Sequence, residues 1–197
     1  MLLLRQVYLA HMEARRFEEA LETARQMLPL EVLTDVAHQD AARACLGLGR
    51  RADAIEHLRL AGRTGPAGRR AFHLWTLGSV QLLGGEAREA LGALERARRW
   101  ATADRPLYAA QVALARAALG DDPGDLGRLR EELEDAPCGR GYGQLVLGEL
   151  AVLLGDPVAA RRHLKSFVRR ASGGRVALAV GLEAEIARAR ALLASLR

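Results

Sequence analysis

The sequence repeats a glycine followed five residues later by an alanine, at intervals of about 35 residues. A fixed period of this length is typical of a repeat array, in which each unit buries its apolar face only against its neighbours. Gly120 keeps the glycine without the alanine, and a first copy has Arg15 at the glycine position. The three complete copies are Gly49–Ala54, Gly85–Ala90 and Gly155–Ala160, and the alanine register runs Ala20, Ala54, Ala90, Asp125 and Ala160, in steps of 34, 36, 35 and 35 residues.

The third copy shows what one unit contains. Apolar residues recur with helical spacing over residues 72–83, and the glycine pair at 84–85 then ends the helix, because glycine accepts the left-handed conformation. A second helix is predicted over residues 86–99, with small and apolar residues at three- and four-residue steps. No segment alternates with a period of two, so the sequence predicts an all-α chain of about five helical hairpins.

Small residues recur inside the predicted helices at positions where two backbones must approach closely. Gly78 lies in the first helix of the third unit and Ala90 in the second. A larger side chain at either position would separate the helices, at a cost of about 1–3 kcal/mol in overpacking.

At these residues the chain resembles the tetratricopeptide repeat (TPR) family, with degenerate repeats. Leu77–Gly78 and Leu147–Gly148 match the Leu-Gly pair of that family's first helix, and Phe17 matches the aromatic residue after its turn. The resemblance covers about residues 3–170. It implies a right-handed α-solenoid in which the first helices of successive units line a concave surface.

The array is expected to occupy residues 1–174, in units of approximately 1–33, 34–70, 71–106, 107–141 and 142–174. Residues 175–197 are expected to form a C-terminal capping helix with one polar side, which would cover the exposed end of the last unit. The sequence leaves two places open for this helix, the end of the stack or the groove. At the other end, helical character begins at Met1, so the first helix either frays or uses its exposed side for self-association.

The resemblance also places a set of residues on the concave surface, many of them aromatic or large and apolar. Aromatic residues anchor protein interfaces, so we expect a groove that binds an amphipathic helix or an apolar peptide. The alternative is that several of these residues belong to the core between repeats. The predicted groove residues are Arg5, Leu9, Met12, Arg43, Leu46, Phe72, Trp75, Leu82, Leu114, Tyr142, Leu145 and Glu149.

The predicted lining lacks the basic clamp with which some TPR proteins bind a C-terminal carboxylate. Some TPR proteins hold a partner's C-terminal carboxylate with Lys, Asn and Arg, but this chain has no asparagine and its one lysine is Lys165. Arg5 and Arg43 could still bind an acidic side chain.

The net charge of +5 suggests nucleic acid as a possible partner, because phosphate groups bind clustered basic residues. Arginine pairs fall at expected helix ends, acidic residues are interleaved, and no aromatic residue alternates with the arginines. This pattern makes nucleic acid an unlikely partner. The excess of arginine and absence of asparagine fit either a GC-rich genome or a high working temperature.

No catalytic, metal or cofactor site is predicted. The five histidines are scattered, the two cysteines lie in different units, and the glycine-rich segments lack the Gly-Lys-Ser/Thr ending of a phosphate loop. No apolar run is long enough for a signal peptide or a membrane span, so a cytoplasmic bacterial protein is expected.

These observations together predict a non-catalytic scaffold or adaptor for protein–protein interaction. The alternatives are a regulatory module that docks on a catalytic or DNA-binding protein and, with less support, a helical repeat that binds nucleic acid directly.

Overall fold

The computed structural model describes residues 1–173, 179 and 181–196 of the chain. Within these residues the regular structure is helical throughout. Two short 3₁₀ turns, Leu28–Leu30 and Pro137–Arg140, connect neighbouring hairpins. The α-helices are α1 (Leu2–Glu13), α2 (Phe17–Met27), α3 (Thr34–Gly47), α4 (Arg51–Thr64), α5 (Ala67–Leu83), α6 (Ala87–Trp100), α7 (Arg105–Leu119), α8 (Leu126–Asp135), α9 (Gly143–Leu153), α10 (Pro157–Ser172) and α12 (Glu183–Ser195).

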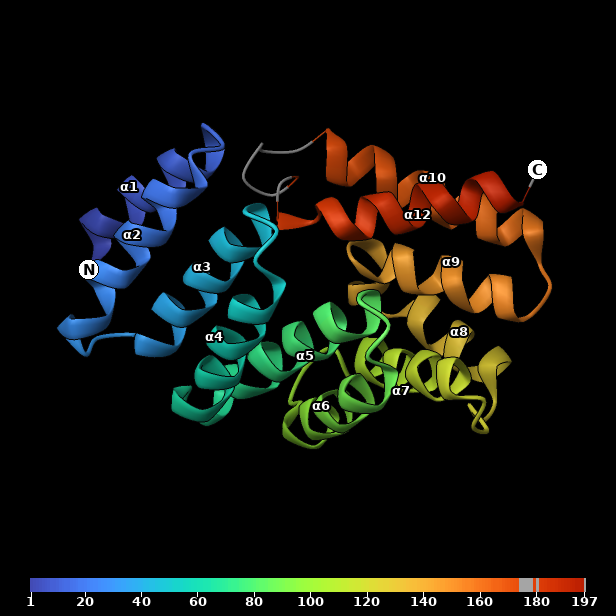
Figure 1. Ribbon diagram of the computed structural model, residues 1–197. Helices are drawn as coiled ribbons and strands as arrows, with labels where there is room; N and C mark the ends of the chain where they lie inside the picture. Colours follow the sequence, from blue (N-terminus) through green and yellow to red (C-terminus); the bar gives the residue numbers. More distant parts are fainter. Residues whose placement is uncertain (174–178, 180, 197) are drawn as a thin grey trace.

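Successive helices pair into five hairpins, from α1–α2 to α9–α10, and each hairpin packs on the next. Figure 1 shows the hairpins following one another in an arc from the N-terminus to the C-terminus. The predicted all-α solenoid of TPR-like hairpins is confirmed. The helix predicted over residues 72–83 begins earlier, at Ala67, directly after Pro66. Of the helix predicted over 175–196, the structure describes α12, while residues 174–178 and 180 lie outside the described part.

Each hairpin turn has a residue in the left-handed conformation at the position where the sequence repeats glycine, in addition to Gly124 in the fourth turn. Four of these residues are glycines, with φ between 70° and 82°. In the first hairpin the position is occupied by Arg15, with φ 55°. A side chain in this conformation costs about 1–2 kcal/mol, so the first turn is strained where the others are not. The four glycines are Gly49, Gly85, Gly120 and Gly155.

The two helices of a hairpin touch at the small residues that the sequence repeats. A Cβ atom added to Gly78 would lie 2.6 Å from Cγ of Leu94, and one added to Gly148 would lie 2.6 Å from Cγ of Leu164. Both leucines are fully buried, as are Ala54, Ala90 and Ala160 of the alanine register. The predicted close approach of the backbones is therefore present in the third and fifth hairpins.

We expect Gly78→Ala to destabilise the protein by about 1–3 kcal/mol, because the new methyl group overlaps the buried Leu94 side chain. Gly92→Ala is the matched control: Gly92 is exposed on α6, nothing lies within 4 Å of its added Cβ, and alanine is the better helix former. This control should gain about 0.5–1 kcal/mol. Urea unfolding followed by circular dichroism measures both, and equal effects of the two variants would contradict the steric argument.

Candidate partner-binding groove

The last helix lies along the array and also reaches across it. α12 packs on α10 and α9, the helices of the last hairpin, and it also contacts α5, two hairpins earlier. Figure 1 shows it lying beside α10 with its beginning directed towards the middle of the array. The two places that the sequence left open for this helix are thus both occupied, because one side of α12 covers the last hairpin while another lines the concave surface.

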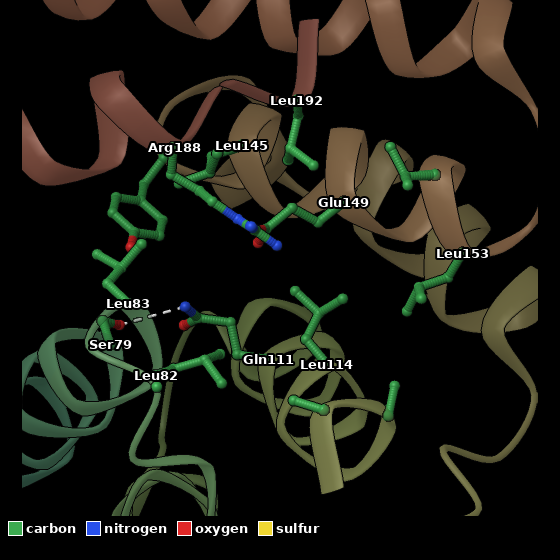
Figure 2. Close-up of a pocket in the computed structure, with 15 residues that line it drawn as sticks. Ser79, Leu82, Leu83, Gln111, Leu114, Leu145, Glu149, Leu153, Arg188 and Leu192 are labelled. Atoms are coloured by element: carbon green, nitrogen blue, oxygen red, sulfur yellow. Dashed lines mark hydrogen bonds and ion pairs between the residues drawn. The ribbon is translucent and has the colours of Figure 1, made fainter. Parts of the chain in front are cut away.

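A first cavity of about 360 Å³ lies between α5, α7, α9 and α12. Its walls are mainly leucine side chains, and Figure 2 shows Leu82 and Leu114 facing Leu145 and Leu192 across the space. Polar groups enter it at few points. Arg188 of α12 donates from Nε to Glu149 of α9 at 3.0 Å, which ties the last helix to the lining.

A second cavity of about 500 Å³ adjoins the first and is lined by four aromatic side chains, Phe72, Trp75, Tyr142 and Phe167. Trp75 lies at its centre, with ring centroids 5.7 Å from Phe72 and 4.7 Å from Tyr142, and Phe167 of α10 continues the series at 6.1 Å from Tyr142. Tyr142 and Ser79 border both cavities, and we call the two adjoining cavities together the concave groove.

Hydrogen bonds between helices fix the floor of the concave groove. The Trp75 indole N–H donates to Gln111 of α7, and the Gln111 amide donates to the Ser79 hydroxyl at 3.2 Å. On the other side, the Tyr142 hydroxyl donates to Glu185 of α12 at 3.5 Å. Burial raises the pKa of Glu185 to about 7, against the lowering effect of this hydrogen bond.

The pKa of the Glu149 carboxyl group is likewise set by two opposing effects, burial and a neighbouring positive charge. Burial raises the pKa of Glu149 more than the Arg188 guanidinium lowers it. Two carboxylates with raised pKa therefore face the interior of the concave groove from α9 and α12, and a single arginine pairs with one of them.

The structure brings most of the predicted groove residues together but separates those of the first unit. Met12 is buried and Leu9 half-buried in the core of the first hairpins, and Arg5 donates to Asp40 at 3.1 Å. Leu114 and Leu145 border the first cavity yet are mostly buried, so the core alternative describes much of their surface. The predicted residues that line the two cavities are Arg43, Leu46, Phe72, Trp75, Leu82, Leu114, Tyr142, Leu145 and Glu149.

Several lining residues were not predicted. Gln111 comes from α7, the first helix of its hairpin. Phe167 and Arg170 come from α10, the second helix of its hairpin. Glu185 and Arg188 come from α12. The resemblance directs attention to first helices only. The two glutamates and two arginines of 183–190 were visible in the sequence, but the sequence did not decide whether this helix covers the end of the stack or lies in the groove.

The remaining buried polar clusters join helices. His73 of α5 is bound between Asp35 and Gln39 of α3, with ring nitrogens 2.8 and 2.9 Å from their side-chain oxygens, and Arg69 closes the cluster. Burial lowers the pKa of His73, while the Arg69 and His73 hydrogen bonds outweigh burial and lower that of Asp35 to about 2.

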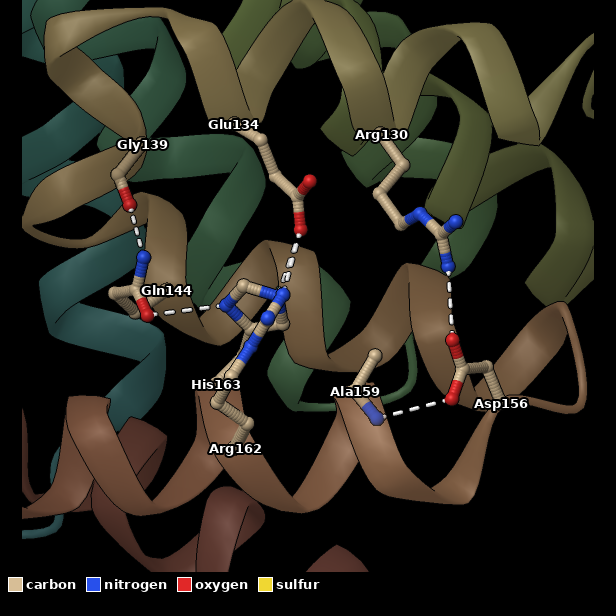
Figure 3. A network of polar contacts seen from close by, with 8 residues as sticks. All are labelled: Arg130, Glu134, Gly139, Gln144, Asp156, Ala159, Arg162 and His163. Atoms are coloured by element: carbon tan, nitrogen blue, oxygen red, sulfur yellow. Dashed lines mark hydrogen bonds and ion pairs between the residues drawn. The ribbon is translucent and has the colours of Figure 1, made fainter.

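A histidine at the same repeat position plays a similar part in two hairpins. His163 on α10 lies 3.1 Å from Gln144 and 2.9 Å from Glu134, so it joins three helices (Figure 3). Its counterpart His57 on α4 lies 3.1 Å from His38 of the same hairpin. Within the described residues no group of three or more His, Cys, Asp or Glu could hold a metal ion.

Within the described residues, every helix is too short or too polar to cross a bilayer.

The fold is similar to that of several solved structures. No protein-family model and no curated protein sequence matches the chain. Among solved structures, MamA aligns with a TM-score of 0.53 at 18% identity, over 88% of this chain and 91% of that one. A MamA RS-1 double mutant aligns with a TM-score of 0.55 at 18% identity, over 94% of each chain. A Podosopora anserina structure, described as putative kinesin light chain TPR-like repeats, aligns with a TM-score of 0.51 at 16% identity, over 98% of this chain and 94% of that one. The chain therefore has the fold of a TPR-like protein with degenerate repeats, which confirms the resemblance.

The raised pKa of Glu185 predicts that stability depends on pH. The folded protein binds this proton up to about pH 7, whereas the unfolded chain releases it near the ordinary pKa of 4.5, so stability should fall as pH rises through this interval, by about 1–3 kcal/mol. Glu185→Gln should remove most of this difference between about pH 5 and pH 8 in urea unfolding. Glu183→Gln, exposed on the same helix, should keep it; identical pH profiles for the two variants would show that Glu185 is not the group responsible.

Proposed function

We propose that the protein is a non-catalytic scaffold that binds an amphipathic helix or an apolar peptide segment in the concave groove. The observation that carries the proposal is the pair of adjoining cavities, lined by apolar and aromatic side chains from several helices. TPR-like folds are generally interaction scaffolds, which is the coarser function that the comparisons support. The expected setting is the cytoplasm of a bacterium.

The rim of the groove offers apolar surface to a partner. Phe72 is 39% exposed at the second cavity and Leu153 is 48% exposed at the first. Large apolar side chains at the edge of a concave surface gain most from burial when a partner covers them.

The second cavity is lined by two arginines and by one carboxylate, that of Glu185. Arg43 and Arg170 line it, and neither has an ion-pair partner within the described part of the chain. We therefore propose that the bound segment carries an acidic residue close to its apolar ones. The sequence predicted that Arg5 and Arg43 would bind an acidic side chain of the partner. Arg43 can take this role, whereas Arg5 already forms an ion pair with Asp40.

The groove is best tested at its rim, because its centre is also core. Trp75 packs against three buried clusters, so its loss would damage the fold as well as the groove. We expect the double variant Phe72→Glu, Leu153→Glu to keep the melting temperature within a few degrees and to lose the partners that the wild-type protein retains in affinity purification with mass spectrometry. Val158→Glu is the control, since Val158 is 74% exposed on α10 and lies outside the groove.

Retention of the same partners by the rim variant and the wild type would contradict the groove proposal. The alternative function, a module that regulates a catalytic or DNA-binding protein by docking, uses the same surface. It is distinguished by the identity of the retained partner and by a change in that partner's activity when the purified protein is added.

A second contact is proposed at the start of the array. Leu2 and Leu3 are 80% and 78% exposed on α1, and Val7 is 41% exposed. Leu3 and Val7 are four residues apart and so share one side of the helix. We propose that this side mediates self-association.

Sedimentation velocity at increasing concentration should show a monomer–oligomer equilibrium for the wild-type protein. Leu3→Glu, Val7→Glu should shift it to monomer, because two charges would have to be buried in the contact. The Val158→Glu control should behave as the wild type. A wild-type protein that stays monomeric at every concentration would refute self-association.

A further inference from the structure

The outer side of the array contains a third cavity, of about 600 Å³, whose lining residues differ from those of the concave groove. It lies between α4 and α6, the second helices of the second and third hairpins, and α5 forms its floor with Leu74 and Leu77. The volume is within the range of pockets that bind small ligands.

Four arginines converge on this outer cavity. Arg59 and Arg63 are one helical turn apart on α4, Arg96 lies opposite on α6, and Arg70 belongs to α5. The lining contains one carboxylate, Glu56, whose ion pair with Arg59 is long at 3.9 Å. The cavity therefore carries an excess of positive charge that a ligand with several negative charges would neutralise.

A high arginine content alone does not produce such a site, as the equivalent cavity between α8 and α10 shows. That cavity is also lined by two arginines, but each has its carboxylate: Arg130 donates to Asp156 at 3.2 Å and Arg162 to Glu134 at 3.1 Å (Figure 3). The two outer cavities thus differ in charge balance within one protein.

An aromatic ring completes the outer cavity. Trp100, at the end of α6, is one turn beyond Arg96 and is 44% exposed. The Arg70 guanidinium carbon lies 4.6 Å from the centre of its ring. Arg70 therefore covers one face of the indole, and the exposed part of the ring is a surface on which a nucleobase stacks, while the other arginines bind phosphate oxygens.

We propose that the cavity between α4, α5 and α6 binds a nucleotide, with its base against Trp100 and its phosphates on Arg59, Arg63 and Arg96. This site is independent of the proposed groove function. The nucleotide is either free or part of a single-stranded nucleic acid, and the two sources share the chemistry that the cavity recognises.

Isothermal titration calorimetry at about 0.15 M salt tests the proposal with three probes: ATP, inorganic tripolyphosphate and a single-stranded RNA of about ten nucleotides. We expect Arg63→Gln, Arg96→Gln to weaken ATP binding at least about tenfold. Both side chains are exposed and lack an ion pair within the described residues, so the fold should be kept. The matched control is Arg161→Gln, Arg190→Gln, which removes the same charge from a cationic cavity without an aromatic ring and should change affinity less than about twofold.

Trp100→Leu separates the base from the phosphates. It should weaken ATP binding and leave tripolyphosphate binding unchanged, because only ATP has a ring to stack. RNA that binds more tightly than ATP, with the same response to the variants, assigns the site to a polymer; ATP binding without RNA binding assigns it to a free nucleotide.

Three results would overturn the proposal. The first is a wild-type protein that binds neither ATP nor RNA, and the second is equal loss of binding in the control variant. The third is tripolyphosphate that binds as tightly as ATP, with no effect of Trp100→Leu on the binding of either probe. Melting temperatures of all variants, together with the single variant Arg96→Gln, distinguish a lost site from a lost fold.

Discussion

The close approach of the two helices in each hairpin is the contact on which the rest of the structure depends. Where Gly78 meets Leu94 and Gly148 meets Leu164, there is no space for even a methyl group without displacement of the leucine. Each hairpin is rotated by a small angle relative to the next, and the curvature of the array is the sum of these rotations. The concave groove and the outer cavities are consequences of that curvature.

A repeat array is stabilised mainly by contacts between adjacent units. The buried polar clusters of this chain also connect adjacent hairpins. His73 with Asp35 and Gln39, and His163 with Glu134, join helices of adjacent hairpins. The Tyr142 ring, 4.7 Å from that of Trp75, joins the fifth hairpin to the third, and α12 makes a further long-range contact, with α5. The ties of α12 to the groove include Glu185, a buried carboxylate whose pKa is raised to about 7 by burial, so this long-range contact depends on pH near neutrality.

Sequence patterns predicted the parts of the fold that are set locally. The turn positions followed from glycine at a constant interval, and the helix contacts followed from small residues at a constant offset, since both are determined within one unit. The groove was predicted only in part. Trp75 and Tyr142 lie where the first helices should place them, but Met12 is buried in the core, because the repeat pattern does not show which first helices remain open.

The unpredicted residues are those whose positions depend on the whole array. Phe167 and Arg188 reach the groove because α10 and α12 lie over its end, which depends on the accumulated curvature. Trp100 and Arg70 are thirty residues apart in sequence and no aromatic residue alternates with the arginines, yet the fold brings the indole and the guanidinium together.

Arg15 occupies a left-handed turn that glycine fills in the other hairpins, and α1 has a neighbour on one side only. In a row of units held by adjacent contacts, the unit with the weakest internal geometry and the fewest neighbours opens first. Loss of structure should therefore begin at α1 and α2 and advance towards the middle of the row. The helices that build the concave groove would be the last to separate, so the protein could lose its first hairpin and still keep its binding surface.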